Sequence, residues 1–82
     1  MQFQEATEGE FRIYAGALES PVGDGYTAAL VVQRGRGHVE RAAFRDDLLA
    51  CGHRWASADE ALAYAVRKAR EMIRKQPEAL HA

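Results

Sequence analysis

The residues of this chain whose types and spacing could support chemistry are first a cysteine and a histidine two positions apart. Cys51 and His53 offer a thiolate beside an imidazole, which is either a nucleophile with its base or two ligands of a metal. The other two histidines, His38 and His81, lie far away in the sequence, so a four-ligand zinc site would need an improbable convergence. We therefore interpret Cys51 as a semi-buried cysteine and His53 as an exposed side chain of the same loop, and we predict no metal site.

Three acidic residues form the second group that could support chemistry. Asp46 and Asp47 are adjacent, and together with Glu40 they suggest an acid–base pair or a site for a hard metal. Adjacent side chains on a strand point to opposite faces, so the two aspartates do not converge if the strand continues. We interpret one of them as the cap of the "DLLACG" turn or helical fragment that follows.

The remaining motifs do not indicate an enzyme. The closely spaced glycines of "PVGDGY" lead into a strand, whereas phosphate-binding loops and dinucleotide fingerprints open directly into a helix. No serine, histidine and acid stand at a spacing that predicts a catalytic set. We therefore predict a protein that is not an enzyme, with no catalytic residue and no cofactor.

Composition and charge indicate an ordinary globular domain. The chain has 82 residues, of which 48% are hydrophobic and 28% charged, so we expect one packed domain with a small core. The net charge is −1, without the basic excess of a dedicated nucleic-acid binder. A single cysteine excludes an internal disulfide, and neither a signal peptide nor a membrane-spanning run is recognisable. We expect a soluble cytoplasmic protein.

The clearest element predicted from the sequence is a helix in "WASADEALAYAVRKAREMIRKQP". Ser57 is a natural N-cap, Glu60 completes a capping box three positions later, and Pro77 ends the helix. Apolar residues recur at three- and four-residue spacing and form one stripe that must be buried: Ala58, Ala61, Leu62, Ala65, Ala69, Met72 and Ile73. The many alanines favour a close approach to a sheet.

Three strands are predicted before this helix. "EFRIYAGALES" places Phe11, Ile13, Ala15 and Ala17 at period two, and "YTAALVVQR" places Tyr26, Ala28, Leu30 and Val32 on one face. "HVERAAFRD" is a weaker third strand, and the "GRG" before it has the composition of a hairpin turn. In the connection "DLLACGHRW", we expect Leu48, Leu49 and Trp55 to close the end of the core.

The predicted fold is α+β, with a three-stranded antiparallel β-sheet in β-β-β-α order and one C-terminal helix packed on one face. Residues 1–82 form a single domain with an ordered core at about 10–76, and residues 1–9 and 76–82 are flexible termini.

One helix leaves the second face of this sheet open. That face is unusually apolar for a surface in contact with water: Arg12, Tyr14, Leu18, Thr27, Ala29, Val31 and Val39. Exposed apolar patches of this kind mark interfaces. We expect Tyr14, Leu18, Ala29 and Val31 to form the interface of a homo-oligomer, with a dimer as the simplest case. The alternative is that the N-terminal segment folds over this face.

The three strands and the helix of "GHRWASADEALAYAVRKA" resemble the C-terminal two-thirds of a double-stranded RNA-binding domain. The resemblance aligns Ser57 with the serine that begins the last helix of that family, and it implies the same layout. The phosphate-gripping lysines of the family are replaced by Ala58, Asp59 and Glu60, and "MQFQEATEGE" does not supply its first helix. The resemblance therefore implies the fold without that family's mode of RNA binding.

A second resemblance rests on "YAGAL", "DGYTAALVV" and "WASADEALAYA", which are similar to small bacterial proteins of unknown function with strand, strand, strand, helix order. This resemblance implies no catalytic residue.

Basic residues supply the alternative function. Arg34 precedes the "GRG" turn and Arg36 lies within it, and further arginines lie in the second half of the helix at positions Arg67, Arg70 and Arg74. Together they would form a path for the phosphates of a nucleic acid, although cations near a helix C-terminus are also what the helix dipole and solubility favour. Our leading prediction is a non-enzymatic protein that acts through protein–protein association as a homodimer; the alternative is nucleic-acid binding through these arginines.

Overall fold

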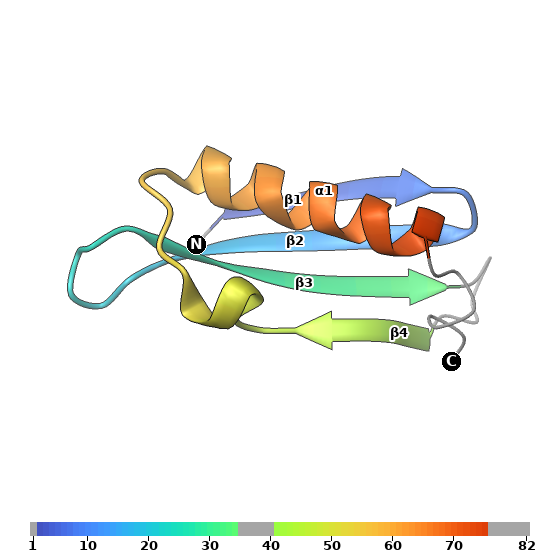
Figure 1. The fold of residues 1–82 in the computed structure, drawn as a ribbon, viewed down its shortest axis with the longest axis horizontal. Helices are drawn as coiled ribbons and strands as arrows, with labels where there is room; N and C mark the ends of the chain where they lie inside the picture. The colour runs from blue at the N-terminus through green and yellow to red at the C-terminus, as the bar shows by residue number, and fades with distance from the viewer. Residues whose placement is uncertain (1, 35–40, 76–82) are drawn as a thin grey trace.

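The computed structural model describes residues 2–34 and 41–75 and contains one antiparallel sheet with one helix. The chain runs through β1 (Gln2–Glu8), β2 (Phe11–Glu19), β3 (Tyr26–Arg34), β4 (Arg41–Asp46), a short 3₁₀ segment η1 (Leu49–Gly52) and α1 (Ala58–Lys75). The strands lie side by side in the order β1-β2-β3-β4, and α1 crosses one face of the sheet (Figure 1). The predicted α+β layout, with an antiparallel sheet and a C-terminal helix on one face, is confirmed.

Strand β1 is the element that the sequence does not predict. Residues 1–9 are expected to be a flexible end, but residues 2–8 form a fourth strand that pairs with β2 from Gln2↔Ala17 to Glu8↔Phe11. A two-residue turn joins the two strands, and Gly9 begins it at φ 59°. A glycine at positive φ in a two-residue loop matches the twist of a hairpin. The N-terminal segment therefore extends the edge of the sheet instead of folding over its open face.

The core lies between α1 and the sheet, and small residues make it thin. The side chains of Ile13, Leu30 and Val32 have at most 1% of their surface exposed. Burying an aliphatic or aromatic side chain of this size contributes about 1.5–3 kcal/mol, and four other large side chains are buried beside them: Phe11, Leu49, Leu62 and Ile73. The helix alanines predicted to let α1 approach the sheet are buried: Ala58, Ala61, Ala65 and Ala69. Three alanines of the sheet, Ala15, Ala17 and Ala28, are buried as well. Period-two and helical spacing thus predict most of the core, although Tyr26 and Met72 are only partly buried.

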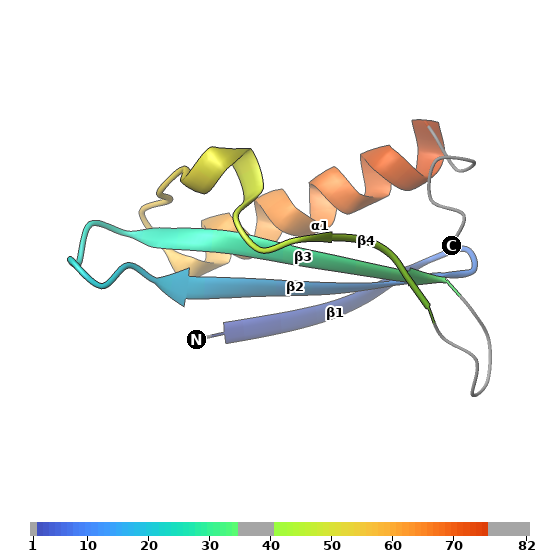
Figure 2. The ribbon, with the colours of Figure 1, turned by 90° about the horizontal axis from the view of Figure 1, so that it is seen from below.

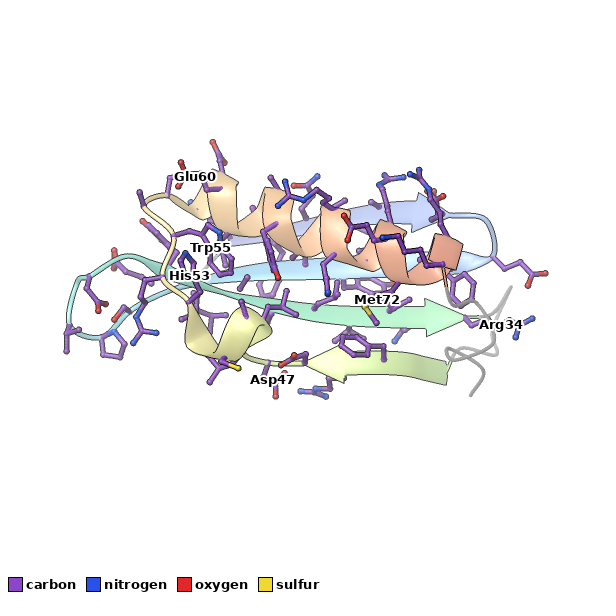
Figure 3. The ribbon with its side chains drawn as sticks, viewed as in Figure 1. Arg34, Asp47, His53, Trp55, Glu60 and Met72 are labelled. Carbon is purple, nitrogen blue, oxygen red and sulfur yellow. The ribbon has the colours of Figure 1, made fainter. Side chains whose placement is uncertain are left out.

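Helix α1 begins as predicted. The backbone N–H of Glu60 donates to Ser57 Oγ at 3.2 Å, and Glu60 Oε2 accepts from the backbone N–H of Ala56 at 3.2 Å. The carboxylate therefore reaches one residue further back than in the usual capping box, where it accepts from the N-cap residue itself. Glu60 lies at the start of the helix in Figure 3. Pro77 and residue 76 lie outside the described residues.

The segment between β4 and α1 is held against the start of β3. Tyr26 and Trp55 exchange two backbone hydrogen bonds, each of 2.8 Å. Leu49 is buried and Trp55 packs against the core, as predicted, but Leu48 is 53% exposed, so the expectation that it closes the core is wrong. Its backbone N–H donates to Asp46 Oδ1 at 3.0 Å, so Asp46 closes the turn that precedes η1, while no side chain caps η1 itself.

None of the described helices is long and apolar enough to cross a membrane.

Candidate functional site

The open face of the sheet is the surface opposite α1, and no described segment covers it (Figure 2). Directly paired residues of neighbouring strands point to the same side of a sheet. The register therefore places Glu5, Tyr14, Val31 and Arg45 in one row that crosses all four strands. A neighbouring row holds Phe3, Gly16 and Ala29. Apolar residues occupy the middle of the face, and charged residues of opposite sign stand at its two edges.

Phe3 is the most exposed apolar side chain of this face, with 75% of its surface accessible. Its ring leans over Gly16, so that a Cβ at Gly16 would stand 3.5 Å from Phe3 Cε1. An aromatic ring over a cross-strand glycine covers backbone that would otherwise be open to water. The sequence does not predict Phe3 as an interface residue, because it lies in the segment expected to be flexible.

A shallow depression of about 340 Å³ lies beside Phe3 on the same face. All four residues predicted for the interface line it: Tyr14, Leu18, Ala29 and Val31. None of the four is fully buried, whereas the central residues on the other face of β2 and β3 are almost completely inaccessible: Ile13, Ala15, Ala17, Ala28, Leu30 and Val32. Arg45 and Asp47 border the depression at the β4 edge. The structure thus brings the predicted interface residues together on one apolar surface.

The margins of the open face are polar. At the β4 edge, Arg45 Nε donates to Asp47 Oδ1 at 3.2 Å, and both side chains are more than two-thirds exposed. At the other end of the strands, Arg12 pairs with Gln33 in the register. Gln33 Oε1 is inaccessible to water and has no hydrogen-bond partner among the described residues. Of the other residues assigned to this face from the sequence, Thr27 donates its hydroxyl to the carbonyl of Leu18, and Val39 lies outside the described residues.

Two helix arginines are held by one acidic residue of the first hairpin, Glu8. Arg70 donates to Glu8 Oε1 at 2.7 Å, and Arg74 donates to Glu8 Oε2 at 2.9 Å. The hydrogen bond from Arg74, followed by its charge and by Arg70, lowers the pKa of the Glu8 carboxyl below its ordinary value. These two cations therefore fasten α1 to β1, and they carry a carboxylate between them where a phosphate path would have to run.

The other arginines of the alternative function also make contacts within the chain. Arg34 donates to Glu10 Oε2 at 3.3 Å, and its guanidinium lies 5.8 Å from the centre of the Phe11 ring. Arg67 lies over the ring of Tyr64 at 5.6 Å, which is a cation–π distance. Arg36 lies outside the described residues. Arg67, Arg70 and Arg74 line one shallow depression on α1 together with the acidic Glu71, whereas Arg34 contacts Glu10 and Phe11.

Cys51 and His53 have separate surroundings. His53 is exposed, and its ring meets the edge of Trp55 at 4.7 Å between centroids; the two side chains lie together in Figure 3. Cys51 is exposed, so the interpretation of a semi-buried cysteine is wrong. The backbone at Cys51 adopts a positive φ of 57°. Within residues 2–34 and 41–75, no group of three or more potential metal ligands comes together.

No protein-family model, curated protein or solved structure matches this chain.

Proposed function

We propose that this chain is a non-enzymatic protein that acts by protein–protein association, and that it forms a homodimer through the open face of its sheet. The observation that carries the proposal is the gathering of Phe3, Tyr14, Leu18, Ala29 and Val31 on one uncovered surface. An apolar surface in contact with water is unfavourable by about 25 cal/mol for each Å², so covering it provides the driving force for association.

A second copy of the chain is the simplest cover for this surface. Sheets pack face to face at about 10 Å, with side chains of the two inner faces interdigitating. The open face of this protein offers both parts of such a contact, because Phe3 protrudes and the neighbouring depression recedes. Two-fold dimers are the commonest oligomers, and they bury the same patch on both subunits. The cytoplasm remains the expected compartment, since a single exposed cysteine suits a reducing environment.

The alternative, nucleic-acid binding through the arginines, is less well supported. Its cations at Arg70 and Arg74 are already paired with Glu8. A phosphate would have to displace the Glu8 carboxylate, which both arginines hold, and the negative charge of Glu8 would then repel the phosphate. We therefore base the proposed function on the open face alone.

Two alanine-to-arginine variants test the proposal. Ala29→Arg places a charge in the centre of the open face, while Ala63→Arg places the same charge on the exposed side of α1. Both are examined by size-exclusion chromatography with light scattering at micromolar concentrations. The proposal expects the first variant to be monomeric and the second to keep the dimeric mass of the unaltered chain. Equal masses for both variants would count against the open face as the interface.

A further inference from the structure

The row of residues that crosses the open face has opposite charges at its two ends. Glu5 stands on β1 and Arg45 on β4, with Tyr14 and Val31 between them. Glu5 has no ion-pair partner among the described residues, and Arg45 shares its charge with Asp47 at the surface. Glu5 and Arg45 stand in the same row on opposite edges of the sheet. A second copy of the same surface can therefore form an ion pair with each of them.

Symmetry restricts how two copies of this face can meet. When identical surfaces pack against each other, the two-fold axis lies in the plane of contact. An axis across the strands brings β1 over the partner's β1, so Glu5 would face the same residue of the second copy. An axis along the strands, between β2 and β3, brings β1 over the partner's β4. Glu5 then faces the partner's Arg45, and Tyr14 faces the partner's Val31.

We infer that the homodimer has its two-fold axis along the strands, between β2 and β3, with Glu5 of each copy paired to the partner's Arg45. This inference rests on the proposed function and specifies its geometry. Complementary charges select one orientation of a docked pair more than they add affinity, and juxtaposed like charges exclude the other. The guanidinium has five N–H donors, so Arg45 can donate to Asp47 and to the Glu5 carboxylate of the second copy at the same time.

The shape of the face agrees with the same axis. Phe3 protrudes from β1, and the depression extends from it toward Arg45 and Asp47 at the β4 edge. Rotation about an axis along the strands brings Phe3 of each copy toward the partner's depression. Rotation about an axis across the strands would bring the two protruding rings to the same edge and leave the depressions opposite each other. Charge and shape therefore favour one arrangement, with the crossing of about −30° that sheet twist imposes.

Charge reversal of each partner tests the pairing. In the homodimer of Glu5→Lys, a lysine would face the partner's Arg45, and in the homodimer of Arg45→Glu, two glutamates would face each other. We expect each variant to self-associate at least about tenfold more weakly than the unaltered chain. When the two variants are mixed in equal amounts, a dimer with one copy of each can form. In this mixed dimer, the new lysine at position 5 faces the new glutamate at position 45, and the native Glu5 faces the native Arg45. The mixed dimer should therefore form with nearly the affinity of the unaltered chain, as should the homodimer of the double variant.

Analytical ultracentrifugation measures the dissociation constants, and native mass spectrometry with one variant tagged identifies the mixed dimer. Circular dichroism of each variant checks that the fold is retained. Glu71→Lys is the matched control, since it reverses an exposed glutamate on α1 and should leave association unchanged.

Failure of the two proposals can be told apart. If the unaltered chain dimerises and Ala29→Arg abolishes the dimer, but the two charge variants bind each other no better than themselves, the axis is wrong and the open face remains the interface. If the unaltered chain is monomeric at high-micromolar concentration, both the face and the axis are overturned.

Discussion

Phe3 on β1 lies directly opposite Gly16 on β2, and its ring leans over the space that a side chain at Gly16 would fill. The ring contacts the sheet with one side only, and three-quarters of it is exposed. An aromatic side chain held in this way is a rigid projection with little conformational entropy left to lose on binding. It is the feature of the open face best suited to anchor a second copy.

Replacing this ring should weaken association. For Phe3→Ala we expect the dissociation constant of the homodimer to rise by about tenfold or more, since an aromatic side chain that fills a depression of the partner typically contributes more than about 1 kcal/mol to an interface. Val22→Ala is the matched control, because Val22 is 78% exposed in the loop between β2 and β3, away from the open face. Sedimentation equilibrium measures both constants. Similar dissociation constants for the two variants would exclude Phe3 as the anchor.

The pairing of Glu8 with the helix arginines predicts a pH dependence of stability. Because the arginines lower the pKa of Glu8 in the folded chain, the ionised carboxylate stabilises the fold. This contribution is fully present above the unfolded pKa of about 4.3 and is lost as the pH falls through the lower folded value. We expect Glu8→Gln to be less stable than the unaltered chain at pH 7 and equally stable at pH 2 to 3. Urea denaturation across this range measures the difference, and a constant difference would refute the assignment.

The N-cap of α1 gives a prediction about stability that does not involve the open face. Ser57→Ala removes the acceptor for the backbone N–H of Glu60 and should lower the free energy of unfolding by about 0.5–2 kcal/mol. Glu60→Gln should lower it less, because an amide oxygen can still accept from the backbone N–H of Ala56. Chemical denaturation of both variants provides the comparison. An equal loss for both would mean that charge at the helix start matters more than the hydrogen bonds.

Gly25 marks the place where the helix connection meets the β2–β3 loop. It adopts φ +123°, and a Cβ there would lie 2.5 Å from the carbonyl oxygen of Trp55. Gly25→Ala should therefore strain the backbone and separate Trp55 from Tyr26, with a loss of more than about 2 kcal/mol. Gly23→Ala is the control, because Gly23 also has a positive φ but open space around it, and about 1–2 kcal/mol is expected. Thermal unfolding distinguishes the two, and equal losses would argue against the close contact.

The parts of the fold that the sequence predicts are those in which burial repeats locally. Alternation in β2 and β3 and the alanine stripe of α1 report the side that faces the core, so the core and the open face both follow from spacing. Tyr14, Leu18, Ala29 and Val31 were identified as a common surface for this reason.

Strand β1 cannot be predicted from an alternating apolar pattern, because it lies at the edge of the sheet and carries few apolar residues. It is held by the backbone ladder to β2 and by Glu8, whose partners Arg70 and Arg74 come more than sixty residues later. No local pattern predicts a contact of this separation. The glycine of the two-residue turn after Glu8 was the available signal for a hairpin. Without β1, neither Phe3 nor Glu5 could be assigned to the open face.

The molar mass of the unaltered chain in solution is the decisive measurement for the proposed homodimer. Light scattering across a concentration series from low to high micromolar should give twice the chain mass of 9.1 kDa, with dissociation only on dilution. A constant mass of 9.1 kDa over the whole series would contradict the proposal that this protein acts as a homodimer through the open face of its sheet.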